Sequence, residues 1–131
     1  MSRSPASLFE IAFTQADYGL RAYVTGINGT FETTLSYWRR IAAEARRTNP
    51  AALLVVDGIY GEPPPPEQLQ AVVLAMKDEG IVHLPIAYVA DDVAQIPQVE
   101  LAGLMANESG FKVRIFGDEH EALLWLRYGE H

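Results

Sequence analysis

The sequence predicts an α/β domain in which a mostly parallel sheet begins with an antiparallel hairpin and helices pack against the sheet. Two runs of alternating polarity, residues 8–14 and 20–25, stand near the start of the chain. Short apolar runs follow at residues 52–56, 84–90 and 111–116, and stretches with helical spacing separate them. Alternation is typical of half-buried strands, and strands that alternate with helices favour a parallel sheet. The expected order is β-β-α-β-α-β-α-β-α.

Length and composition limit the class of protein. The chain has 131 residues, of which 49% are hydrophobic, and this favours a single domain over residues 1–131 with an ordinary core. There is no cysteine, which excludes disulfides, thiolate metal sites and cysteine nucleophiles. The net charge is −7, and residues 51–131 hold thirteen acidic residues against four basic ones. Because such a charge repels phosphate backbones, we expect no nucleic-acid partner.

The apolar segments are short. No uninterrupted one exceeds six residues, the length of the run at 51–56, which is far below the roughly 20 residues that a membrane-spanning helix needs. Residues 1–5 lead into no apolar stretch, so a secretory signal is not expected. We therefore expect a cytoplasmic protein with no membrane span.

The opening hairpin is predicted from its alternation and its turn. Each strand has an apolar face, made by Phe9, Ile11 and Phe13 in the first and by Leu20, Ala22 and Val24 in the second. Residues 15–19 between them contain turn formers and a glycine, which favours an antiparallel pair. Asn28-Gly29 is expected to end the second strand.

A helix is predicted after the hairpin, with Thr30 as its N-cap and Asn49-Pro50 as its end. Its apolar residues are spaced by four and three, and they are Phe31, Leu35, Trp38, Ala42 and Ala45. The arginines at positions 39, 40, 46 and 47 lie largely off this stripe. They make either a solvated face or a surface for an acidic partner.

The central strand is predicted at residues 52–56, whose continuous apolar character suits a strand covered on both faces. Four prolines at 63–66 either stiffen the following loop or dock on an aromatic groove of a partner. The last of them suits the first turn of the next helix. That helix carries Leu69, Val72, Val73 and Met76 and is expected to end near Gly80.

Two further βα units complete the pattern. After the strand at 84–90, Asp91 or Asp92 is expected to cap a helix that ends at Gly110. This helix carries Val99, Leu101, Leu104 and Met105. After the strand at 111–116, Asp118 and Glu121 have the spacing of a capping box. Ala122, Trp125 and Leu126 of the last helix are expected to point inward.

The order of elements and the segment Lys112–Leu126 resemble the SpoIIAA-like branch of the STAS superfamily. This segment, KVRIFGDEHEALLWL, is similar to the closing strand, acidic turn and final helix of that family. The resemblance implies a SpoIIAA-like/STAS-like fold and a regulatory or interaction module rather than an enzyme. In family members with a phosphoserine switch, the serine begins the helix after the central strand. Residues 57–66 here contain neither serine nor threonine, so we expect no such switch.

Acidic residues follow several of the predicted strands. Because parallel strands end at one edge of a sheet, we expect six carboxylates to gather there, from Asp57, Glu62, Asp91, Asp92, Asp118 and Glu119. Such a group suits a divalent cation or a basic protein surface. Aspartates at helix starts also cap free N–H groups, and we favour this reading over a metal site.

The sequence therefore favours a non-catalytic regulatory or protein-interaction domain that acts by surface binding. No nucleophile and base stand in a recognisable motif, and neither a catalytic residue nor a cofactor is expected. The partner is another protein or a second copy in a homodimer, and the residues expected to bind it, or a ligand, are Asp57, Tyr60, Glu62, Asp91 and Asp92. The alternative is a small-molecule binding module for an apolar or lipid-like ligand. Its pocket would lie between the sheet and the helices that carry Trp38, Met76 and Met105.

Overall fold

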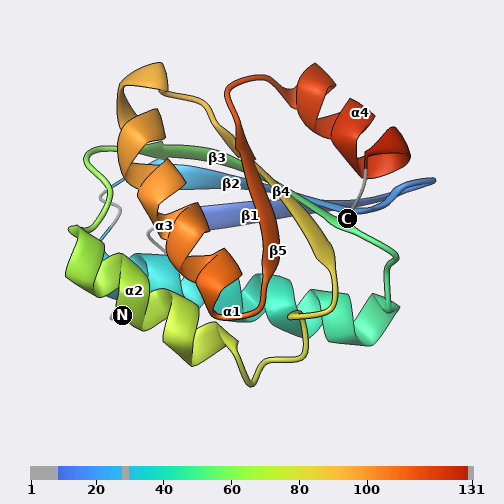
Figure 1. Cartoon of the computed structure of the whole chain (residues 1–131), viewed down its shortest axis with the longest axis horizontal. Helices are drawn as coiled ribbons and strands as arrows, with labels where there is room; N and C mark the ends of the chain where they lie inside the picture. The colour runs from blue at the N-terminus through green and yellow to red at the C-terminus, as the bar shows by residue number, and fades with distance from the viewer. Residues whose placement is uncertain (1–8, 28–29, 130–131) are drawn as a thin grey trace, which may run out of the picture.

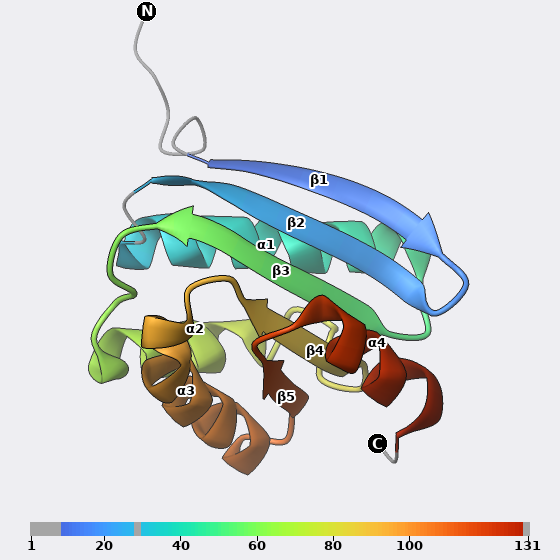
Figure 2. The ribbon, with the colours of Figure 1, turned by 90° about the horizontal axis from the view of Figure 1, so that it is seen from above.

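The computed structural model describes residues 9–27 and 30–129, and its centre is a single five-stranded sheet. The strands are β1 (Phe9–Ala16), β2 (Gly19–Ile27), β3 (Leu53–Tyr60), β4 (Pro85–Ala90) and β5 (Lys112–Phe116). They lie side by side in the order of the chain, as Figure 2 shows from above. β1 pairs with β2 antiparallel, and all other pairs are parallel. The predicted α/β class and strand directions are confirmed.

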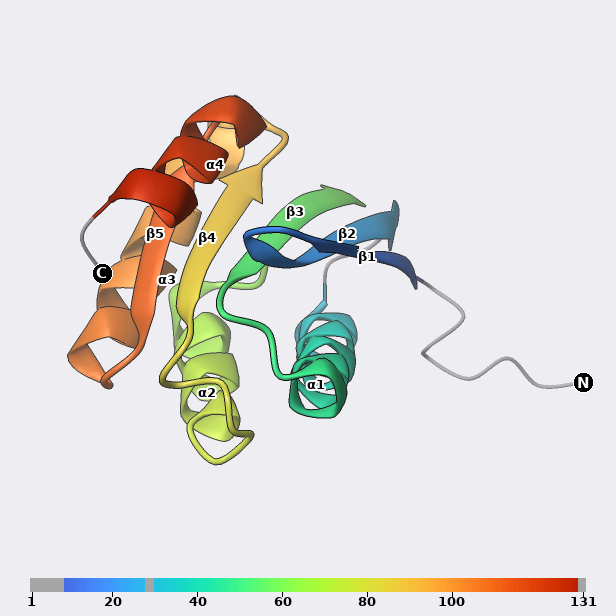
Figure 3. The ribbon, with the colours of Figure 1, turned by 90° about the vertical axis from the view of Figure 1, so that its right-hand side faces the viewer.

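Four α-helices cover the two faces of the sheet unequally. α1 (Phe31–Thr48), α2 (Pro66–Met76) and α3 (Ile96–Glu108) connect the parallel strands and pack on one face. α4 (Glu119–Tyr128) follows β5 and packs on the other face (Figures 1 and 3). Parallel strands joined by right-handed crossovers place consecutive helices on one face, which explains the arrangement of α1 to α3. None of the helices in the described part of the chain is long and apolar enough to cross a membrane.

The hairpin forms as its alternation predicts. Leu20, Ala22 and Val24 are fully buried, and Phe9 is buried opposite them on β1. Gly19 starts β2 with a φ of 144°. A Cβ atom at this position would lie 2.1 Å from the carbonyl oxygen of Ala52, so only glycine permits this close approach. The predicted end at Asn28-Gly29 and the chain start at residues 1–5 lie outside the described residues.

The central strand β3 contributes to two cores, one on each face of the sheet. Leu53 and Val55 point into the core under α1, α2 and α3, whereas Leu54 and Val56 point into the core under α4. All four are buried, as the continuous apolar run predicts. Because side chains alternate along a strand, a single short segment holds the two layers together.

The caps of α1 are those predicted, but its buried face is rotated from the predicted stripe. The Thr30 side chain accepts a hydrogen bond from the N–H of Thr33, and Asn49 adopts the left-handed conformation with a φ of 51°. Tyr37 and Ile41 are buried at 3% and 0% exposure, whereas Trp38 is only partly buried. The cause is that α1 packs against both β1–β2 and α2, so residues beside the stripe are also covered.

The start of α3 differs from the prediction. A short 3₁₀ turn, Val93–Gln95, stands between β4 and α3, and Asp92 accepts a hydrogen bond from the N–H of Ala94 in this turn. Gln95 is the N-cap of α3 and makes no capping bond with its side chain. Asp92 therefore caps the 3₁₀ turn rather than the α-helix. On α3 itself, Leu101 and Leu104 are exposed, and the helix buries Val99, Gly103 and Ala106 instead.

The last helix is placed as predicted. Asp118 accepts a hydrogen bond from the N–H of His120 at the start of α4. Ala122 and Leu126 are buried against β3 and β4, and Trp125 is partly buried beside Phe116. At the first turn, Glu119 accepts two hydrogen bonds from the guanidinium of Arg21 on β2, at 2.8 and 3.0 Å. This ion pair fastens α4 to the hairpin side of the sheet.

Candidate functional site

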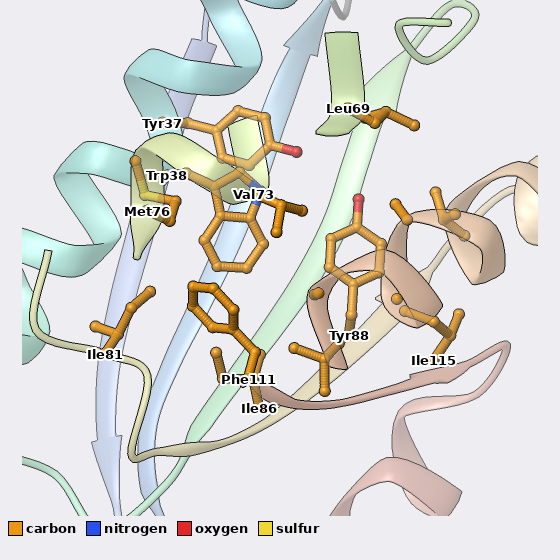
Figure 4. A pocket seen from close by; sticks show the side chains of 15 residues that line it. Tyr37, Trp38, Leu69, Val73, Met76, Ile81, Ile86, Tyr88, Phe111 and Ile115 are labelled. Atoms are coloured by element: carbon orange, nitrogen blue, oxygen red, sulfur yellow. The ribbon is translucent and has the colours of Figure 1, made fainter. Parts of the chain in front are cut away.

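An apolar pocket lies between the sheet and the three helices on its first face. Its volume is about 100 Å³. Four aromatic side chains form much of the wall, and they are Tyr37, Trp38, Tyr88 and Phe111 (Figure 4). Aliphatic side chains of α2, α3, β4 and β5 form the rest, among them Met76 and Ile115. The volume exceeds that of several water molecules, and the lining suits an apolar occupant.

The aromatic wall is built by contacts between α1 and β4. The rings of Trp38 and Tyr88 stack with their centroids 6.2 Å apart and an interplanar angle of 17°. Tyr37 lies against Trp38 at 6.1 Å and against Phe9 at 6.1 Å in an edge-on arrangement. Rings packed in this way leave each side chain few alternative rotamers, so the wall is preorganised.

One end of the apolar pocket is polar. The hydroxyl groups of Tyr37 and Tyr88 point toward the same space beside Leu69 (Figure 4). The Tyr88 hydroxyl donates a hydrogen bond to Oδ2 of Asp57, and Oδ1 of Asp57 accepts one from the N–H of Ile59 at 2.9 Å. Asp57 lies on β3 directly after the buried residues Leu53–Val56. Its carboxylate therefore lies at the end of an otherwise apolar space.

Burial controls the protonation of these three groups. Desolvation raises the pKa of Tyr37 and of Tyr88 above their usual range, and the nearby Asp57 carboxylate adds to both increases. Burial also raises the pKa of Asp57, while the hydrogen bonds from Tyr88 and Ile59 oppose this increase. The two phenols therefore remain protonated over the physiological pH range and act as hydrogen-bonding hydroxyls, not as bases.

A loop closes the polar end from outside. A smaller cavity of about 30 Å³ shares Tyr37 and Tyr88 with the apolar pocket and is bounded by Asp57 and by residues 61–64 between β3 and α2. Gln95 donates a side-chain hydrogen bond to the carbonyl of Gly61, and Gln98 donates one to the carbonyl of Pro64 at 2.9 Å. Pro64 itself is buried. Here the prolines form a wall held in place by α3, which is consistent with a stiffened loop.

The predicted site residues divide between this polar end and the surface. Asp57 lies at the polar end, bonded to Tyr88. Tyr60, Asp91 and Asp92 line a larger hollow of about 510 Å³ at the ends of β2, β3 and β4, which we call the strand-end hollow. Tyr60 is 78% exposed, and both aspartates are exposed. Glu62 is also exposed and borders the smaller cavity.

The expected gathering of six carboxylates at one edge occurs only in part: Asp91 and Asp92 line the strand-end hollow, and Asp57 and Glu62 border the smaller cavity next to it. Asp57 faces inward to Tyr88, and Glu119 turns to the opposite face of the sheet, where Arg21 binds it. Asp92 and Asp118 are occupied as caps of their own helical turns. Among residues 9–27 and 30–129, no three acidic or histidine side chains stand close enough together to hold a metal ion. Local capping and one long-range ion pair account for the separation.

Tyr37 and Tyr88 are functional candidates that the sequence did not reveal. Tyr37 stands one position away from the predicted apolar stripe, and Tyr88 lies in a strand predicted as plain core. Tyr88 could have been recognised from the sequence as a candidate. It carries the one hydroxyl group in an otherwise aliphatic strand, and a buried hydroxyl needs a hydrogen-bonding partner. The expected place of a ligand pocket agrees with the structure for Trp38 and Met76, which line the apolar pocket, but not for Met105.

Comparison with known proteins adds no relative to these observations. No protein-family model matches the sequence, and a search of curated proteins finds no significant match.

Proposed function

We propose that this chain is a non-catalytic STAS/SpoIIAA-like domain that binds a small, largely apolar molecule in the apolar pocket. The observation that carries the proposal is a preorganised aromatic cavity with hydrogen-bonding groups at one end only. Pockets of this kind, mostly apolar with a few placed polar groups, are typical of small-molecule sites. The order of strands in the sheet and the Lys112–Leu126 segment support the STAS/SpoIIAA-like assignment.

The size of the cavity favours a ring-sized ligand over a long acyl chain. Engineered apolar cavities of about 150 Å³ hold benzene, and the cavity here is of the same order. For a ligand of about eight heavy atoms, a gain of roughly 0.6 kcal/mol per atom corresponds to a dissociation constant in the sub-millimolar range. Such an affinity suits a sensor of an abundant small molecule.

The chemistry of the polar end supports binding rather than catalysis. Both oxygens of Asp57 accept hydrogen bonds within the protein. The raised pKa of Tyr88, caused by burial, keeps its proton in place. Because the Tyr88 proton is held in place and each Asp57 oxygen already accepts a bond within the protein, the arrangement favours holding a ligand over removing a proton from it.

Toluene is a suitable first probe for the apolar pocket. We expect saturable binding of toluene to the wild-type protein, measured by ligand-observed NMR and by the fluorescence of Trp38. The Ala102→Phe variant should lose this binding at least tenfold, because its ring fills the pocket from α3. Leu104→Phe adds the same ring to the exposed face of α3 and should bind as the wild type does. Equal binding by the two variants would contradict the proposal.

Native mass spectrometry of the freshly purified protein gives an independent test. A reproducible additional mass that is lost in Ala102→Phe but kept in Leu104→Phe would identify the natural occupant. An additional mass that both variants retain would place the ligand elsewhere.

Protein interaction at the strand-end hollow is a second candidate function. Ile27 and Tyr60 are neighbours in the β2–β3 register and are 56% and 78% exposed. Exposed Asp91 and Asp92 line the same hollow as Tyr60, and exposed Glu62 follows Tyr60 by two positions, so this surface combines exposed apolar and acidic side chains. A basic partner or a second copy in a homodimer fits this pattern. No serine or threonine lies in residues 57–66, and binding here would work without a phosphoserine switch.

The second candidate is tested with a charge-reversed variant that leaves the apolar pocket intact. Asp91→Lys/Asp92→Lys with Tyr60→Ala should reduce partner capture, or dissociate a homodimer seen by light scattering, at least tenfold. Glu67→Lys/Glu108→Lys changes two exposed charges elsewhere and is the control. Unchanged association in the first variant would exclude this surface.

The proposed setting is the cytoplasm. The absence of cysteine is compatible with a reducing compartment. In the described residues, no helix is long and apolar enough to span a membrane. A fluorescent fusion of the full chain would test the location directly.

A further inference from the structure

We propose that β1, the open edge strand of the sheet, pairs antiparallel with β1 of a second copy, so that two five-stranded sheets join into one in a homodimer. The sheet has two edges, β1 on one side and β5 on the other (Figure 2). None of residues 9–16 lines the apolar pocket or the strand-end hollow, so this surface is a separate one. The two edges differ in that β5 is blocked and β1 is open.

The β5 edge is blocked by a side chain of α3. The amide group of Asn107 donates a hydrogen bond to the carbonyl of Val113 at 3.0 Å and accepts one from the N–H of Val113 at 2.9 Å. These two bonds occupy both backbone groups that Val113 would offer to a further strand. Exposed Lys112 and Arg114 flank this residue, and charged side chains commonly protect strand edges. Another strand therefore cannot pair readily with β5.

The β1 edge has no comparable protection within the described residues. Positions 9–16 contain no lysine, arginine or proline, and Glu10 is the only charged residue among them. The register with β2 runs without a bulge from Phe9 to Ala16. No described segment pairs with β1 on the side away from β2. Since edge strands are normally protected by charges, prolines or bulges, an eight-residue edge without them indicates a place where another strand pairs.

The backbone groups that β1 offers to a partner can be deduced from β2. The N–H of Leu20 donates to the carbonyl of Ala52, so Leu20 faces β3 and its neighbour Arg21 faces β1. Because Thr14 lies opposite Arg21, the backbone of Thr14 bonds to β2. The residues on either side of Thr14 then direct both N–H and C=O outward, and this alternates along the strand. The outward residues are Phe9, Ile11, Phe13 and Gln15.

This set of outward residues is self-complementary. When two copies of β1 run antiparallel with Ile11 opposite the second copy's Phe13, Phe9 falls opposite the second copy's Gln15. All four outward residues of each copy are then paired. A shift by two residues in either direction leaves one of them unpaired. Ile11 and Phe13 are only partly buried within one copy, and they would cover each other across the new strand pair.

The other face of the paired strands also tolerates this register. Its two-fold axis passes between the two copies of Ala12, whose side chain is small and exposed. Glu10 falls opposite Thr14 of the second copy, so the two carboxylates do not meet. The interface therefore brings no like charges together, although the whole chain has a net charge of −7.

A second copy is the partner that these observations favour. Antiparallel pairing of two identical strands has two-fold symmetry, so one contact uses the open edge of both copies. Because Asn107 blocks the β5 edge, the pairing stops at two copies and does not continue into a fibre.

Charge variants at Ala12 test the pairing and its register together. We expect a wild-type dimer by sedimentation and light scattering of the full chain at about 100 µM. Ala12→Lys should weaken the dimer at least fivefold, because two ammonium groups then lie side by side at the axis. Ala12→Glu should weaken it similarly. An equal mixture of the two variants should associate at least fivefold more tightly than either alone, because unlike charges then meet.

Ala16→Lys is the matched control. It makes the same change at an exposed position on the same face of β1, but beyond the paired residues, and it should dimerise as the wild type does. Toluene binding to Ala12→Lys should equal that of the wild type, which shows that the variant is folded. Loss of the dimer is thereby distinguished from failure of the proposed function.

Three results would overturn the inference. The first is a wild type that stays monomeric at about 100 µM, which would leave the β1 edge to a different partner. The second is a dimer that Ala12→Lys and Ala16→Lys affect equally, or one that the mixture of charge variants does not restore. The third is a dimer that only the combined variant at Tyr60, Asp91 and Asp92 dissociates, which would place the interface at the strand-end hollow.

Discussion

Tyr88 joins two properties that rarely occur together in a central strand. Its ring belongs to the first core and is 8% exposed, while its hydroxyl is bonded to Asp57 at the end of the neighbouring strand. A buried carboxylate is tolerated only when it is well hydrogen-bonded, and Asp57 meets this condition through Tyr88 and the N–H of Ile59. This one contact turns the end of a hydrophobic core into a polar site.

The raised pKa of Asp57 predicts a particular pH dependence of stability. Burial makes the folded protein hold the Asp57 proton more tightly than the unfolded chain does. Between the ordinary aspartate pKa of about 3.8 and the raised one, the folded state binds more protons, so the free energy of unfolding falls as the pH rises. Above the raised pKa this contribution is constant.

Urea denaturation at closely spaced pH values, for the wild type and Asp57→Asn, measures the effect. The wild-type free energy of unfolding, minus that of the variant, should decrease with rising pH through this range. Glu119 and Glu44 have lowered pKa values because of their bonds to Arg21 and Arg47, and they act in the opposite direction. Both proteins contain them, so they cancel in the difference. Asp78→Asn, at an exposed position on another part of the surface, is the control, and a difference curve that rises with pH would contradict the assignment.

Within the described residues, α4 is the only α-helix on its face of the sheet, so its contacts determine how well that face is covered. Ala122 and Leu126 pack on Leu54, Val56 and their neighbours on β4. The paired hydrogen bonds between Arg21 and Glu119 lie at the edge of this contact, where both side chains are about one-third exposed. An ion pair so exposed contributes about 1 kcal/mol or less, so burial of Leu126 is the larger effect.

Leu126→Ala tests this ranking. It should lower the free energy of unfolding by about 2–5 kcal/mol, because it leaves a cavity under α4. Leu124 lies on the same helix at 46% exposure, and Leu124→Ala should cost less than about 1 kcal/mol. Both values come from urea denaturation followed by circular dichroism. Similar costs at the two positions would mean that α4 is not held by its buried face.

Some elements of the fold could be predicted from local sequence patterns alone, and others could not. The hairpin, the central strand and the cap at Thr30 depend on neighbours in the sequence, and each is found at its predicted place, although β3 continues to Tyr60, four residues beyond the predicted end. The rotated face of α1 and the 3₁₀ turn before α3 depend on what packs against them. For the same reason, the exposure of Leu101 and Leu104 could not be deduced from their helical spacing.

The candidate site was harder to predict from the sequence, because its contacts join residues that are far apart in the chain. Asp57 and Tyr88 are 31 positions apart, and Arg21 and Glu119 are 98 apart. Asp57 was predicted as a binding residue, but its partner Tyr88 could not be identified from the sequence. Topology alone suggested that all acids after strands share an edge, whereas individual bonds direct Asp57 and Glu119 to different faces.

Across the whole molecule, the two cores are joined through shared strands. β3 and β4 each send alternate residues to both faces, so neither core can lose its packing without disturbing the other. Residues 9–27 and 30–129 should therefore unfold in a single cooperative step. The two tryptophans allow a test, because Trp38 packs on the first core and Trp125 on the second.

Single-tryptophan variants report on each core separately. Trp125→Phe leaves Trp38 as the fluorophore, and Trp38→Phe leaves Trp125. Within each variant, the fluorescence and circular dichroism transitions in urea should coincide. A fluorescence transition of Trp125 at lower urea than the loss of helix signal would mean that the α4 side unfolds on its own.

The order of the strands in the sheet also bears on how the protein is made. In the part of the chain that the structure describes, every strand after β1 pairs with the one that precedes it, and none is inserted between two others. During translation each new strand leaves the ribosome to find its neighbour already synthesised. The sheet can therefore grow by addition at one edge, from the hairpin toward β5, without waiting for the rest of the polypeptide.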